Sequence, residues 1–214
     1  MIYLKESFNL HPASPANRDR FIGGVEEGLL PASSSHGARL VGSWFAHEEW
    51  YSQIVHVTEF DDLAAFDEYR KAARTDARLI EAQAKLANLA LERRSELLEP
   101  LGAVPISALH DAIEASRNEP VGVYTFAILE VTPGSMEQFS SMLAGAASAL
   151  PIAAAWRDVS GNPNRVIDLW KGDTGKAGFR PTNDQQNAFF EPLREVAPRE
   201  RMMRLHAMPY SPLR

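Results

Sequence analysis

A weak internal repeat constrains the fold of this 214-residue chain more than any other feature. Trp44 and Trp156 lie 112 positions apart (156 minus 44), and the segment SQIVHVTE from Ser52 aligns with NRVIDLWK from Asn164 at the same spacing. Self-similarity at this spacing indicates two related halves of roughly 100 residues, because a solenoid needs more copies. We therefore expect one structural unit built twice.

Each half has the order β-α-β-β-α-β. The pattern predicts strands at 2–10, 38–46, 52–60 and 104–110 and helices at 15–30 and 63–98 in the first half. It predicts strands at 121–131, 152–159, 165–170 and 202–208 and helices at 135–150 and 183–196 in the second half. Proline and serine end the first helix at Pro31, Asp61 and Asp62 offer N-caps to the next, and Ser135 with Gln138 forms a capping box.

This order is that of the ferredoxin-like plait, in which two helices cover one face of a four-stranded antiparallel sheet. The other face must also be buried. We predict an α+β protein of two tandem plaits whose antiparallel sheets pack face to face, with a cavity between the sheets. The predicted units are residues 1–112 and 121–214, joined by a polar linker at 113–120.

Composition excludes several classes of function. The net charge of −6 provides no basic stripe for nucleic acid or an anionic membrane. The absence of cysteine excludes disulfides, thiolate nucleophiles and thiolate-bound metals. The sequence contains no run of 18 apolar residues and no apolar core of a signal peptide, so we expect a cytoplasmic protein with no membrane partner.

His56 and Asp168 are the first candidates for catalysis, because the repeat places them at equivalent positions of the third strands. Alternation along the strand puts His56 and Thr58 on one face. If that face lines the cavity, an imidazole with a pKa near 7 acts as general base and a carboxylate orients it. The alternative is that His56 caps a sheet edge or bonds a helix, while Asp168 faces solvent.

His110 and His206 form a second symmetric pair, each preceded by leucine on a predicted fourth strand. They are the next candidates for an acid or base. They could also bind a metal ion or a carboxylate substrate. Alternatively, both histidines simply end their strands at the rim of the sheet. Ligand geometry cannot be derived from residues so far apart, so we assign no metal site and no cofactor.

Aromatic side chains are candidates for substrate binding, because an inner sheet face rich in aromatics suits a planar or apolar ligand. Equally, they could be core residues. The set consists of Trp44, Trp156, Trp170, Tyr3 and Tyr124, and Thr58 joins it as a polar neighbour of His56.

The segments GARLVGSWF (37–45) and QIVHVTEFDDLAAFDEYRKA (53–72) resemble the NIPSNAP family. The family pattern is a G-x-W strand, then N-x-V-x-H-[LIV]-W-x-[YF], then a helix rich in alanine and charge. His56 and Phe60 match it, whereas Thr58 stands in place of the tryptophan. The second half keeps Asn164 and Trp170 but has Asp168 in place of the histidine. The resemblance implies an intramolecular dimeric α/β barrel with a NIPSNAP-like first unit.

The wider superfamily is similar in fold to cofactor-free monooxygenases, lactone isomerases, decarboxylase-like proteins and haem enzymes, and fold does not decide among them. Our first hypothesis is a small-molecule enzyme without organic cofactor, of the monooxygenase, isomerase or lyase-like kind. Its substrate would be an apolar or aromatic metabolite with a carbonyl group. The alternative is a non-catalytic small-molecule-binding or scaffold protein of the NIPSNAP type. A haem- or metal-dependent variant and a homo-oligomer stay open.

Overall fold

The computed structural model describes residues 1–11, 14–46, 52–172 and 184–214. Its contacts divide the chain into two compact units, Met1–Leu97 with Ala207–Arg214 and Leu98–His206. We call them unit 1 and unit 2. The division falls inside a strand and returns the C-terminal residues to unit 1. The predicted linker at 113–120 is wrong, since residues Ile106–Asn118 form a helix.

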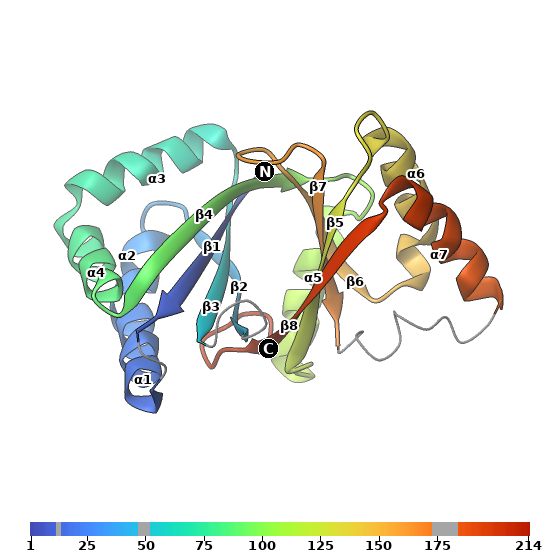
Figure 1. The fold of residues 1–214 in the computed structure, drawn as a ribbon. Coiled ribbons are helices and arrows are strands. Elements are labelled where there is room, and N and C mark those ends of the chain that lie inside the picture. Colours follow the sequence, from blue (N-terminus) through green and yellow to red (C-terminus); the bar gives the residue numbers. More distant parts are fainter. Residues whose placement is uncertain (12–13, 47–51, 173–183) are drawn as a thin grey trace. The chain divides into compact units, whose positions relative to one another are not determined.

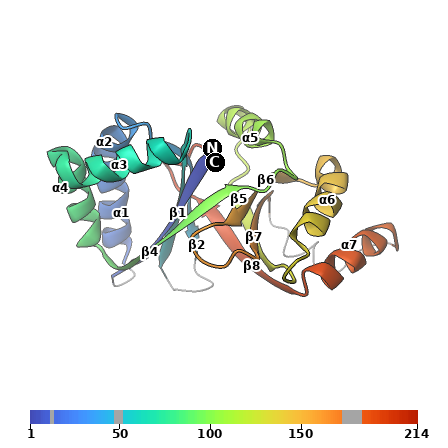
Figure 2. The same cartoon turned by 90° about the horizontal axis from the view of Figure 1, so that it is seen from above.

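Unit 1 is a four-stranded antiparallel sheet with its helices gathered on one side (Figures 1 and 2). The strands are β1 (Ile2–Leu10), β2 (Arg39–Ala46), β3 (Gln53–Phe60) and β4 (Ala90–Pro100), in the order β4-β1-β3-β2. The register pairs Glu6 with His56 between β1 and β3, and Ser43 with His56 between β2 and β3. These three side chains therefore share one face of the sheet.

A continuous helical segment follows β1 and is longer than the sequence suggests. It comprises α1 (Pro15–Gly24), the π-helical turn η1 (Val25–Leu29) and α2 (Leu30–Ser34). The predicted stop at Pro31 is wrong, because a proline early in α2 does not interrupt the bonds of the preceding π turn. The predicted stripe of Phe21, Val25 and Leu29 is buried, as expected.

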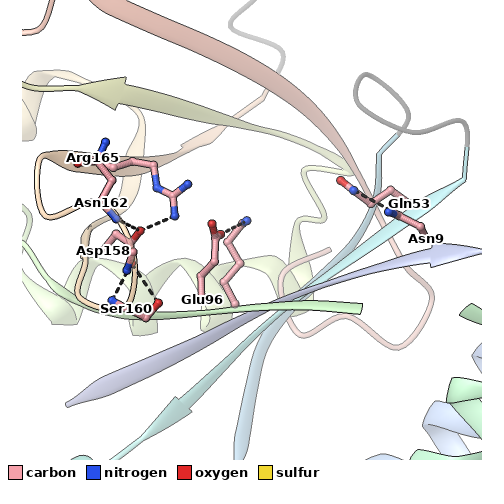
Figure 3. Close-up of polar contacts among 9 residues, drawn as sticks. Asn9, Gln53, Glu96, Asp158, Ser160, Asn162 and Arg165 are labelled. Carbon is pink, nitrogen blue, oxygen red and sulfur yellow. Dashed lines mark hydrogen bonds and ion pairs between the residues drawn. The ribbon is translucent and has the colours of Figure 1, made fainter. Parts of the chain in front are cut away.

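The second helical region ends earlier than predicted. It consists of α3 (Leu63–Thr75), which Asp62 caps by accepting a hydrogen bond from Ala65 N, and α4 (Ala77–Ala87). The rest of the predicted helix is strand β4, so the predicted strand at 104–110 is wrong. The residues of β4 have high helix propensity but form a strand because they pair with β1. Helix propensity is only a weak preference that tertiary contacts can override. Lys5 Nζ, for example, lies 2.5 Å from Glu96 Oε2 (Figure 3).

Unit 2 repeats the topology of unit 1. Its elements are α5 (Ile106–Asn118), β5 (Val123–Glu130), α6 (Met136–Ala146), the 3-10 turn η2 (Ala147–Ala149), β6 (Ile152–Asp158), β7 (Arg165–Lys171), α7 (Asp184–Val196) and β8 (Arg199–Ala207). The strand order β8-β5-β7-β6 again places the fourth strand beside the first, then the third and the second. Helices α6 and α7 lie on one side of this sheet (Figures 1 and 2). The duplication that the repeat predicts is therefore present in the topology.

The turn between β6 and β7 is held by a single carboxylate. Asp158 accepts hydrogen bonds from the backbone N–H groups of Ser160, Gly161 and Asn162 and pairs with Arg165 (Figure 3). Its side chain is almost fully buried. Multiple N–H donors stabilise the charged carboxylate, and the pKa of Asp158 stays below its usual value although burial opposes this.

Each unit has a hydrophobic core between its sheet and its helices. In unit 1 this core includes Phe8, Ile54, Phe21 and Leu79, and in unit 2 it includes Val166, Ile152, Phe139 and Leu143. The capping box predicted at Ser135 is wrong, since its side chain makes no cap hydrogen bond, although α6 begins where predicted.

Candidate functional site

His56 lies on the face of the unit 1 sheet that the helices cover. Its ring centroid is 5.1 Å from that of Phe8 on β1 and 5.9 Å from that of Phe21 on α1. The side chain is 2% exposed. We expected it to project toward a second sheet, and this is wrong, because alternation groups residues by face without telling which face the helices cover.

A short hydrogen-bond chain holds the His56 ring. Tyr210 Oη lies 2.9 Å from His56 Nε2, and the two rings meet edge to face with centroids 5.8 Å apart. Ser43 Oγ in turn donates to Tyr210 Oη at 3.1 Å. Tyr210 belongs to the C-terminal residues of unit 1, so this end of the chain reaches the imidazole.

An ion pair between the exposed Arg93 and the buried Glu6 lies beside this chain. Arg93 Nε on β4 donates to Glu6 Oε1 at 2.8 Å, and the Arg93 guanidinium also lies over the Phe8 ring at 5.5 Å. Glu6 is buried, and it is the cross-strand partner of His56. A charge-assisted contact of this kind offsets the cost of removing the carboxylate from water.

Two small cavities adjoin these polar groups in unit 1. The larger, of about 70 Å³, is lined by Phe8, Leu29, Gln83, Leu86, Ala87, Ala90 and Arg93. The smaller, of about 10 Å³, is lined by Glu6, Leu29, Leu30, Ser33, Ala38, Leu40, His56, Thr58 and Tyr69. Leu29 at the end of η1 lines both. Single π-helical turns occur frequently at functional sites, because they disturb the helix ladder at the point where a ligand or side chain needs room.

Burial keeps three titratable groups of this region, His56, Tyr210 and Tyr69, uncharged at neutral pH. Burial lowers the pKa of His56 to about 3, and the charge of Arg93 adds to this effect. Burial raises the pKa of Tyr210, and it raises the pKa of Tyr69 to about 12. His56 is therefore an uncharged imidazole at neutral pH, which is able to accept a hydrogen bond at one ring nitrogen and to donate one at the other. This differs from the base with a pKa near 7 that the sequence suggested.

Asp168 holds the equivalent position in unit 2. It lies on the face of β7 that carries Val166 and Trp170, both part of the core beneath the helices of that unit. Burial raises the pKa of Asp168 to about 8, and the charge of Glu200 adds to this. Its Oδ1 and the Trp170 Nε1 have no hydrogen-bond partner among the described residues. The expectation that His56 and Asp168 meet in one cavity between sheets is therefore replaced by two separate helix-covered positions.

We expected the aromatic candidates of the first and second strands to line one cavity together with His56, and this is wrong, because they lie on the opposite face of the sheet from His56 and its counterpart Asp168. Trp44 and Trp156 are at most 1% exposed and lie opposite Val55 and Ile167 in their registers. The same faces carry two buried tyrosines, Tyr3 and Tyr124. A substrate-binding role for these residues stays a prediction.

The predicted symmetry of His110 and His206 is wrong. His110 lies in helix α5, whereas His206 lies on strand β8 opposite Val123. The shared Leu-His dipeptide is thus coincidental, because the true counterpart of β8 is β4. A catalytic role for His110 or His206 stays a prediction, and the symmetry of the repeat no longer supports it.

Sequence reasoning missed four residues around His56, namely Glu6, Ser43, Arg93 and Tyr210. Glu6 had a detectable signal, since a charged residue between Leu4 and Phe8 breaks an apolar alternation. Tyr210 had none, because it is 154 positions from His56 in sequence.

Two kinds of feature are absent from the part of the chain that the structure describes. It contains no group of three or more histidine, aspartate or glutamate side chains arranged to hold a metal ion. Within the same residues, no helix is both long and apolar enough to cross a lipid bilayer.

Comparison with known families finds a similarity in the first half of the chain. The NIPSNAP family model matches residues 8–105, a little under half of the sequence. Over these residues the chain is similar to the NIPSNAP family. The matched residues include His56, Thr58 and Arg93, whereas Glu6 and Tyr210 lie outside them. No curated protein matches the sequence.

Solved structures share the fold over nearly the whole chain. A candidate monooxygenase from Lactobacillus acidophilus NCFM has a TM-score of 0.61 and 14% identity, covering 95% of this chain and 92% of its own. A candidate monooxygenase from Fusobacterium nucleatum subsp. nucleatum has a TM-score of 0.60 and 8% identity, covering 96% and 91%. An anthrone oxidase-like protein has a TM-score of 0.53 and 10% identity, covering 99% and 93%. The chain thus has the predicted α+β fold of tandem ferredoxin-like plaits, the fold of dimeric α/β barrels.

Proposed function

We propose that unit 1 binds a small apolar or aromatic metabolite with a carbonyl group, in the layer between its sheet and its helices. We further propose that the chain is a small-molecule enzyme without organic cofactor, of the monooxygenase, isomerase or lyase-like kind. One observation carries the proposal: an uncharged, buried imidazole lies beside a carboxylate–guanidinium pair in an otherwise apolar layer with two cavities. Convergent polar groups in an apolar pocket are the usual mark of a small-molecule site.

The residues suggest distinct roles. A neutral imidazole with a pKa near 3 is a weak base but a good hydrogen-bond donor, and a donor in a dry pocket stabilises charge developing on a carbonyl oxygen. Glu6, the cross-strand neighbour of His56, is the carboxylate that would accept a proton from the carbon next to that carbonyl. The apolar walls formed by Phe8, Leu29 and Leu86 would receive the hydrocarbon part.

The size of the cavities sets a condition on binding. A volume of about 70 Å³ is well below that of ordinary ligand pockets, which are roughly 300–1,000 Å³. A metabolite therefore enters only if the surrounding helices move outward. The π-helical turn η1 is the segment whose Leu29 lines both cavities. One structural relative, the anthrone oxidase-like protein, is named after an aromatic ketone, and two others are named as candidate monooxygenases, which is one of the proposed kinds of reaction.

A second function, binding without catalysis, is favoured by the low pKa of His56. A strongly lowered pKa and nearly complete burial are also what a histidine in a purely structural hydrogen-bond network has. In that case unit 1 would bind a ligand without converting it, or the residues around His56 would serve only as part of the core.

The experiment combines binding and turnover. Benzaldehyde and toluene, a matched pair differing by the carbonyl oxygen, are titrated against the ¹⁵N-labelled protein, and oxygen uptake is followed with anthrone as substrate. We expect preferential binding of benzaldehyde near His56 and turnover that His56→Gln abolishes. The control His11→Gln changes an exposed histidine of the same unit and leaves both unchanged. Binding without turnover supports the second function, whereas equal affinity for both probes contradicts a carbonyl site.

A further inference from the structure

The last eight residues of the chain are built into unit 1. Met208 N donates to Ser43 O at 2.9 Å, and Ser43 N donates to Ser211 Oγ at 2.8 Å, so both backbone groups of Ser43 bond this segment. Ser211 Oγ donates onward to Leu213 O at 2.6 Å. Met208, Ser211 and Leu213 are all buried. We call residues 207–214 the C-terminal tail.

The anchored tail places Tyr210 between Ser43 and His56. The hydroxyl of Tyr210 has one proton, and Ser43 Oγ already donates to its oxygen. If His56 Nε2 also donated to that oxygen, the Tyr210 proton would have no acceptor among the described residues. A buried hydroxyl left unpaired destabilises the fold, so the consistent order of donors is Ser43 to Tyr210 to His56 Nε2. This order leaves the imidazole proton on Nδ1.

We propose that the C-terminal tail is the positioning element of the His56 site: through Tyr210 it fixes the Nδ1–H tautomer, so that the site offers a donor and selects ligands with an acceptor oxygen. His56 Nδ1 has no hydrogen-bond partner among the described residues, and the ring lines the cavity that Glu6, Thr58 and Tyr69 also line. A carbonyl oxygen is the ligand group that such an N–H recognises. The ligand class rests on the proposed function, whereas the tautomer does not.

The tautomer is measured directly. Long-range ¹H–¹⁵N correlation spectra of the uniformly labelled, ligand-free full chain distinguish protonated from unprotonated ring nitrogens, and the spectrum of His56→Gln identifies the His56 signals. We expect a protonated Nδ1 and an unprotonated Nε2 in the wild type. A protonated Nε2 in the wild type overturns the proposal without any variant.

Two variants separate positioning from general packing. Tyr210→Phe keeps the ring but removes the donor, and it should shift the tautomer toward Nε2–H. Ser43→Ala removes only the outer hydrogen bond and should leave the His56 tautomer unchanged. If Tyr210→Phe also leaves the tautomer unchanged, Tyr210 does not position His56.

Ligand binding supplies the second readout. Tyr210→Phe should weaken benzaldehyde binding by about fivefold, the value of one ordinary hydrogen bond, and leave toluene binding unchanged. Equal weakening of both probes would overturn the selection of acceptor ligands. The wild type could show the expected tautomer and yet fail to bind benzaldehyde. That result would refute both the ligand class and the proposed function, but not the role of Tyr210 in positioning His56.

Discussion

Replacing Asp168 with asparagine should remove a loss of stability that the wild-type protein suffers above pH 6.5. The pKa of Asp168 is raised from 3.8 to about 8, so the folded state keeps its proton at pH values where the unfolded chain has lost it. Stability then falls with rising pH across this interval, because the unfolded state binds fewer protons. Glu200, whose pKa burial also raises, works in the same direction.

His56 has the opposite effect over a different range. Its pKa is lowered from 6.5 to about 3, so the unfolded chain binds a proton below pH 6.5 that the folded state does not. Its contribution to stability therefore rises with pH up to 6.5 and is then complete. Between about pH 4 and 6.5 the two residues oppose each other, and above pH 6.5 only the effect of Asp168 continues.

The magnitude follows from the pH interval. Each pH unit between the folded and unfolded pKa values changes the free energy of unfolding by about 1.4 kcal/mol, so the interval from 6.5 to 8 amounts to about 2 kcal/mol. Urea denaturation of wild type and Asp168→Asn at pH 6.5, 7, 7.5 and 8 measures this. We expect the wild type to lose about 2 kcal/mol and the variant to lose little. A flat wild-type profile, or an equal loss in the variant, would refute the assignment of a protonated buried Asp168.

Two further predictions concern local stability and use the same denaturation assay at pH 6.5. Phe139→Ala should cost ~3–5 kcal/mol, because Phe139 is fully buried in the core of unit 2 and its removal leaves a cavity. Asp62→Ala should cost ~1 kcal/mol, since Asp62 Oδ1 caps α3 at 2.8 Å from Ala65 N, whereas Ser135→Ala should cost almost nothing. A larger loss from Ser135→Ala than from Asp62→Ala would contradict the cap geometry.

The sequence predicted the duplicated topology because buried strands and hairpins leave strong patterns. The repeat around Trp44 and Trp156 marks the second strands, and both units have the predicted plait order. The fourth strand of unit 1 was missed, because LERRSELLEP is composed of good helix formers and becomes a strand only through pairing with β1. That pairing involves Lys5 with Glu96 and Asn9 with Glu92, contacts between segments more than 80 residues apart.

The candidate site was predictable only in part. Alternation correctly grouped His56 with Thr58, and the cavity lining confirms that they are neighbours. It could not show that helices cover this face, and so it could not predict the burial that lowers the pKa of His56. The contact between Tyr210 and His56 could not be predicted from the sequence, because the whole of unit 2 separates the C-terminal tail from the rest of unit 1 in the chain.

The two equivalent positions, His56 and Asp168, differ in the hydrogen bonds that their side chains make. Burial lowers the pKa of the imidazole and raises that of the carboxyl, so each position holds an uncharged polar group at neutral pH. In unit 1, Tyr210 hydrogen-bonds Nε2 of the imidazole and holds the ring, and two cavities adjoin its surroundings. In unit 2, Asp168 Oδ1 has no hydrogen-bond partner among the described residues, and the charge of Glu200 further opposes its ionisation. A polar group held in one defined orientation is what recognition of a ligand requires, so unit 1 is the half in which we place the binding site.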